Sequence, residues 1–69
     1  MNKVEVVSRK GHESFEFGTP DEAREWVENF IAQGGKYWIL DKETKTRLAN
    51  AVGIKANQTI VLIPVVAGG

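Results

Sequence analysis

One stretch in the first half of the chain has the pattern of a capped amphipathic helix. Residues 19–35 read TPDEAREWVENFIAQGG. Thr19 can act as the N-cap, Pro20 suits the first helical position, and Glu22 completes a capping box. The apolar side chains follow the i, i+3, i+4, i+7, i+8 spacing of a helix with one buried face: Ala23, Trp26, Val27, Phe30 and Ile31. We therefore expect one helix from Pro20 to about Gln33, ended by one of the two glycines that follow.

The segment before this helix reads as a β-hairpin. Residues 3–9 and residues 13–18 both alternate between apolar and polar side chains, which is typical of strands. Gly11 lies between them and can adopt a positive φ in a short turn. Phe15 and Phe17 fall on one face of the second strand, and we expect them to join Trp26 and Phe30 in the core.

The segment after the helix supplies the remaining strands. Residues 36–40 are rich in aromatic and branched side chains, and residues 47–51 form a short strand or an irregular crossing. Residues 59–66 are apolar on both faces, which places them in the middle of a sheet. We therefore expect an α+β fold: a mixed sheet of four or five strands with one helix across one face.

The composition narrows the functional classes. A chain of 69 residues has room for one core, and it has no cysteine for disulfides or thiolate–metal sites. Nine basic residues balance nine acidic ones, which argues against a nucleic-acid partner. No apolar run approaches the ~20 residues that cross a bilayer, so we expect no membrane partner and a cytoplasmic location.

The polar residues give no pattern of a catalytic or metal site. His12 is the one histidine and sits beside a turn glycine, so we expect a solvated side chain rather than a ligand or a general base. Lys42, Lys45 and Arg47 form a small basic cluster that we interpret as solvated surface. We expect the chain to bind no metal and no cofactor, and to be no enzyme.

The chain ends on the sequence TIVLIPVVAGG, residues 59–69. Pro64 cannot donate a backbone hydrogen bond, so it tends to release the chain from a sheet. Residues 65–69 could then extend about 16 Å at ~3.3 Å per residue. We therefore expect a folded domain over residues 1–64 and a flexible Gly-Gly tail over residues 65–69.

The strand order together with the ending PVVAGG resembles the ubiquitin-like β-grasp sulfur carriers of thiamin and molybdopterin biosynthesis and the related archaeal ubiquitin-like modifiers. The likeness in architecture covers the whole chain, whereas the likeness in motif rests on residues 64–69. Val65 stands where the molybdopterin group usually has a second proline. Ala56, Asn57 and Gln58 replace the common Asp-Gly-Asp type of turn.

The resemblance implies a chemistry for the tail. An E1-like adenylating enzyme would use ATP to activate the carboxylate of Gly69, and sulfide or a persulfide would convert it to a thiocarboxylate that passes sulfur to a synthase. Gly68, Ala67, Val66 and Val65 would thread the channel of the partner. Glycine suits the last two positions because a Cβ would crowd the acyl carbon and the channel.

The resemblance and the strand pattern also imply a docking surface. One helix covers only one face of the sheet, yet the last strand is apolar on both, and an exposed apolar patch usually marks an interface. The open face holds either the set with Val4, Val6, Ile60 and Leu62 or the opposite set. The opposite set, joined by Tyr37 or Trp38, gives the candidate docking residues: Val7, Tyr37, Trp38, Val61 and Ile63.

Two further functions fit the same sequence. The chain could be a protein modifier that is joined through Gly69 to lysines of target proteins, because the same activated carboxylate serves both reactions. It could also be a β-grasp interaction module with an incidental tail.

Overall fold

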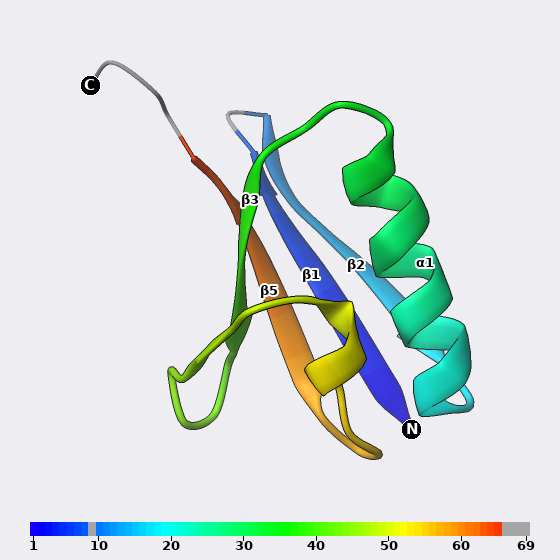
Figure 1. Ribbon diagram of the computed structural model, residues 1–69. Coiled ribbons are helices and arrows are strands. Elements are labelled where there is room, and N and C mark those ends of the chain that lie inside the picture. Colours follow the sequence, from blue (N-terminus) through cyan, green and yellow to red (C-terminus); the bar gives the residue numbers. More distant parts are fainter. Residues whose placement is uncertain (9, 66–69) are drawn as a thin grey trace.

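The computed structural model describes residues 1–8 and 10–65. Its elements are β1 (Asn2–Ser8), β2 (Gly11–Phe17), α1 (Pro20–Ala32), β3 (Tyr37–Asp41), β4 (Arg47–Leu48), a 3₁₀ turn η1 (Ala51–Gly53) and β5 (Thr59–Pro64). The strands form one sheet in the order β2-β1-β5-β3-β4, and α1 lies across one face of it (Figure 1). Among the described residues, no helix is long and apolar enough to span a bilayer.

The sheet is mixed, and β5 lies in its middle. β1 and β5 run parallel, whereas the β1–β2, β3–β5 and β3–β4 pairs are antiparallel. The expected α+β, β-grasp-like fold with one helix across a five-stranded sheet is confirmed. The central place of β5 follows from its composition, because a strand with neighbours on both edges and apolar side chains on both faces leaves the least apolar surface in water.

Local hydrogen bonds fix both ends of α1. The Thr19 hydroxyl oxygen accepts from the Glu22 backbone N–H at 3.2 Å, as the capping-box pattern predicts. At the other end the Gly34 N–H donates to the Ile31 C=O at 3.2 Å, and Gly34 has φ +109°. Only glycine adopts this backbone conformation without steric cost, so the helix ends there.

The segment between β3 and β5 contains both a short strand and an irregular crossing, the two possibilities that the sequence left open for residues 47–51. β4 covers only Arg47 and Leu48, which pair with β3. The chain then turns at Asn50, whose side-chain oxygen accepts from the Val52 N–H at 3.0 Å and caps η1. Of the two possibilities left open for residues 47–51, the short strand forms over Arg47 and Leu48, and an irregular crossing with η1 follows it.

The core lies between α1 and the sheet. Its buried members come from the helix, from η1 and the residue that follows it, and from one face of three strands: Val4, Val6, Ala23, Val27, Ile39, Ala51, Ile54, Ile60 and Leu62. The aromatic side chains form its rim. Trp26 stacks on Phe30 with ring centroids 5.0 Å apart, and Phe15 lies 4.7 Å from Trp26 on the β2 side. The expected core aromatics are thus half-buried and pack against the aliphatic centre.

Candidate docking face and tail base

The register of the sheet decides which face stays open. Val4 pairs with Ile60 and Val6 pairs with Leu62, and all four are buried under α1. Side chains alternate along a strand, so Val7, Val61 and Ile63 point to the face away from the helix. Each of these three is half-buried. Of the two sets that the sequence left open, the one with Val7, Val61 and Ile63 lies on the open face.

Trp38 lies on that open face, whereas Tyr37 lies on the helix side. Trp38 pairs with Ile63 across β3 and β5 and is 41% exposed. The Tyr37 ring lies 5.0 Å from Phe30 and packs against the core. Adjacent residues of a strand point in opposite directions, so only one of the two aromatics can join the open face, and it is Trp38.

Leu40 also belongs to the open face, although we did not select it from the sequence. It pairs with Val61 on β5 and shares the face of Trp38, two residues earlier on β3. The alternation in the sequence KYWIL contained this information, because it places Trp38 and Leu40 together. We call five half-buried or exposed apolar strand residues of this face the open-face patch: Val7, Trp38, Leu40, Val61 and Ile63.

Charged side chains surround the patch. The Glu5 carboxylate accepts from the Lys42 ammonium at 2.8 Å and lies 3.9 Å from Lys3. The hydrogen bond from Lys42, reinforced by the charges of both lysines, holds the pKa of Glu5 below its usual value against the opposing effect of desolvation. On the other side, the Arg47 guanidinium lies 4.4 Å from the centre of the Trp38 ring.

A shallow hollow of about 190 Å³ lies where the patch meets this rim. Leu40, Val61 and Ile63 form its apolar wall, and Lys42 and Lys45 also line it. The basic cluster that we interpreted as solvated surface thus borders the open-face patch. A surface of this kind suits an apolar side chain of a partner that carries carboxylates nearby.

The base of the tail lies at the end of β5, next to the patch. Pro64 pairs with Tyr37, and the Val65 N–H donates to the Lys36 C=O at 2.9 Å. One more backbone bond therefore holds the chain beyond the proline at which β5 ends. The other predicted tail residues, from Val66 to Gly69, lie outside the described part of the chain.

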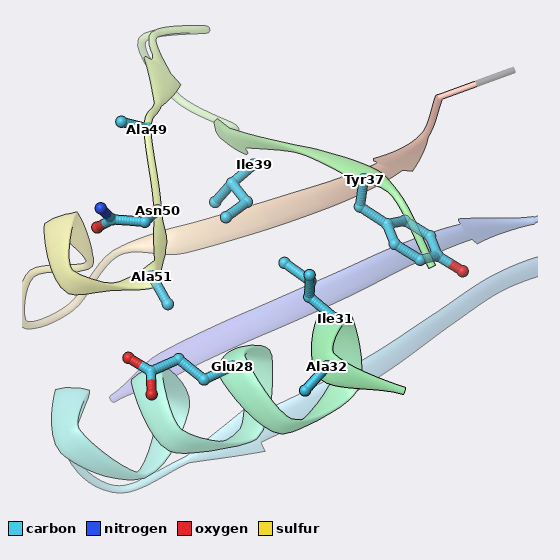
Figure 2. A pocket seen from close by; sticks show the side chains of 8 residues that line it. All are labelled: Glu28, Ile31, Ala32, Tyr37, Ile39, Ala49, Asn50 and Ala51. Atoms are coloured by element: carbon cyan, nitrogen blue, oxygen red, sulfur yellow. The ribbon is translucent and has the colours of Figure 1, made fainter. Parts of the chain in front are cut away.

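A second hollow, of about 350 Å³, lies on the helix side of the sheet. Figure 2 shows Ile31 of α1 and Ile39 of β3 pointing into it, with Tyr37 at one end and Asn50 and Glu28 toward the other. Its lining is mostly aliphatic, and among the residues that the structure describes Glu28 and the Tyr37 phenol are the titratable groups that line it. It offers packing surface rather than an acid–base pair.

The described residues contain no group of three or more His, Cys, Asp or Glu side chains placed to hold a metal ion. His12 is exposed on β2, opposite Val7. Comparisons of the chain with protein-family models, with curated proteins and with solved structures return no match.

Proposed function

We propose that the chain is a sulfur carrier that is activated at Gly69 by an E1-like adenylating enzyme in the cytoplasm. The observation that carries this proposal is the sequence PVVAGG, which begins at Pro64, the last residue of the central strand of a β-grasp-like sheet. β5 pairs with β1 as far as Leu62 and with β3 as far as Pro64, and the Val65 N–H bonds to Lys36, so β3 holds the chain where the tail begins.

In this chemistry the chain is a substrate of the E1-like enzyme and does not itself catalyse a step. The Gly69 carboxylate attacks the α-phosphate of ATP on the partner, which releases pyrophosphate and leaves an acyl-adenylate. Sulfide then displaces AMP and leaves a thiocarboxylate, which donates its sulfur to a synthase that makes molybdopterin or thiamin. The ATP site and the catalytic groups belong to the partners, and the carrier binds no cofactor of its own.

The open-face patch is the surface that we propose for docking both partners. Its member Ile63 comes immediately before Pro64, so a protein that covers the patch also meets the base of the tail. The basic rim of Lys42, Lys45 and Arg47 favours a partner with acidic groups around an apolar centre. Apolar area supplies affinity here, and the charges supply orientation.

Mass spectrometry of the protein isolated from its native cell tests the proposal. We expect a species that ends at Gly69 with one oxygen replaced by sulfur. Gly69→Ala should abolish this species, because a Cβ next to the acyl carbon hinders both attack and threading. Gly53→Ala provides a matched control on η1, where the nearest atom to an added Cβ lies at an ordinary 3.4 Å.

Other outcomes would overturn the proposal. Gly-Gly remnants on lysines of other proteins, with no thiocarboxylate, would instead support a modifier that is conjugated through Gly69. Full function in the cell after deletion of Gly68 and Gly69 would exclude both activated-carboxylate functions and leave a binding module.

A further inference from the structure

The two edges of the sheet differ in length. β4 is an edge of only two residues, Arg47 and Leu48, whereas β2 is an edge of seven. β2 forms the outer strand beside β1 (Figure 1), and its first four residues, from Gly11 to Ser14, are exposed. It contains no proline and no bulge, which are two of the devices that prevent an edge strand from pairing with another chain.

The backbone groups that β2 presents at this edge can be identified. The Lys3 N–H donates to the Gln58 C=O at 3.3 Å, so the backbone of Lys3 is turned toward β5 and away from β2. Lys3 and Glu16 are therefore a non-hydrogen-bonded pair of the β1–β2 ladder. Such pairs alternate with bonded ones, so the N–H and C=O groups of His12, Ser14 and Glu16 point to the outer edge.

A second copy of β2 complements this edge. The antiparallel register that overlaps all seven residues is centred on Ser14, so Ser14 lies opposite Ser14 of the other copy. His12 then lies opposite Glu16, and Glu16 opposite His12. All three outward-facing backbone positions meet outward-facing partners. The His12 imidazole and the Glu16 carboxylate of the other copy lie on the same face and within reach of a hydrogen bond. The dimer contains two such pairs.

We propose that β2 is a self-association edge, through which two copies join antiparallel into one continuous sheet. The contact is isologous, because the same strand serves both copies and the two-fold axis passes between the two Ser14 residues. Growth stops at two copies, because in the described part of the chain the sheet edges left in the dimer are the two-residue β4 strands. The open-face patch and the tail base lie on β5 and its neighbours, so both remain accessible in the dimer.

The mass in solution tests the proposal directly. Light scattering on the full chain over a range of concentrations should show a shift from 7.6 kDa toward twice that value. Ser14→Pro should weaken association at least about tenfold, because it removes an outward N–H that the monomer does not use. Ser14→Thr keeps that N–H and should still dimerise. Circular dichroism checks that both variants fold.

A charge swap tests the register. His12→Glu alone places carboxylates opposite each other at both ends, and Glu16→His alone places imidazoles opposite each other. Each single variant should weaken the dimer, whereas the double variant His12→Glu/Glu16→His restores both pairs and should restore the dimer. Loss without restoration would overturn the proposed register.

Amide hydrogen exchange gives a residue-level readout. The amides of His12, Ser14 and Glu16 should gain protection as the concentration rises, whereas those of Glu13 and Phe15 should be protected at every concentration by β1. A chain that stays at 7.6 kDa up to millimolar concentration, with no change in the exchange of these amides, would overturn the proposal.

Discussion

Asp41 at the end of β3 holds three segments together. Its Oδ1 accepts from the backbone N–H groups of Glu43 and Thr44 at 2.8 and 2.9 Å, and its Oδ2 accepts from the Gln58 amide. The hydrogen bond from the Thr44 backbone, followed by that from Gln58, lowers the pKa of Asp41. The sequence does not reveal this arrangement, because the partner Gln58 lies 17 residues away.

The lowered pKa predicts how stability depends on pH. The folded state binds the Asp41 proton more weakly than the unfolded state, so the charged carboxylate stabilises the fold above about pH 3.9, the ordinary aspartate value. This contribution is lost as the pH falls from that value through the lowered pKa of the folded protein. Chemical denaturation at a series of pH values measures the loss.

Asp41→Asn should destabilise the protein at neutral pH, and the difference from wild type should shrink in acid. The variant places one amide N–H₂ against another, because Gln58 already uses its oxygen to accept from the Lys55 N–H at 2.8 Å and cannot flip freely. Glu43→Gln is the control, since it neutralises an exposed carboxylate in the same turn. An equal pH dependence in all three proteins would contradict the prediction.

The open-face patch shows how far the position of single residues on the sheet could be predicted from the sequence. The sequence indicated that Val7, Val61 and Ile63 share a face, because a period of two is visible within each strand. It did not reveal which face α1 covers, since that depends on the tertiary packing of Val4 and Ile60 against Val27. The choice between Tyr37 and Trp38 depended on the same packing.

At the scale of elements, α1 was predictable almost to the residue, because its caps are local. Thr19 contacts Glu22 three residues away, and Gly34 bonds back to Ile31. β4 and η1 were less predictable. Their extent depends on where β3 offers a free edge and on where Asn50 turns the chain, and neither follows from periodicity.

Thr19→Ala should therefore destabilise the protein through one element. Loss of the N-cap exposes the Glu22 N–H and costs about 1 kcal/mol, which lowers the melting temperature of a domain of this size by roughly 4–8 °C. Thr19→Ser keeps the hydroxyl and should melt close to wild type. Thermal unfolding followed by circular dichroism measures both melting temperatures. Equal values for Thr19→Ala and Thr19→Ser would show that the lost hydroxyl cap does not cause the destabilisation.

At the scale of the whole molecule, β5 serves two surfaces at once. Its side chains alternate between the core and the open-face patch, so Leu62 is fully buried under α1 whereas its neighbour Ile63 lies on the patch. In a chain this small, one core side chain carries a large share of the net stability. The two neighbours therefore allow folding and docking to be tested separately on one strand.

Leu62→Ala should lower the free energy of unfolding by about 2–5 kcal/mol, because it removes buried methyl groups and leaves a cavity. Ile63→Ala should cost only about 1 kcal/mol, since half-exposed apolar area contributes less. For binding to the partner, Ile63→Ala should have the larger effect of the two. Ile63→Ala should weaken binding to the proposed E1-like partner at least about tenfold, whereas the folded fraction of Leu62→Ala should bind as wild type does.

Urea denaturation measures the free energies of unfolding of the two variants, and titration of the labelled protein with the purified proposed partner measures their binding. Trp38→Ala should behave like Ile63→Ala, because the two side chains are cross-strand neighbours on the same face. Tyr37→Phe is the matched aromatic change on the helix side and should leave binding intact. If Ile63→Ala and Trp38→Ala bind as tightly as wild type while Tyr37→Phe does not, docking belongs to the helix side and the open-face patch has another role.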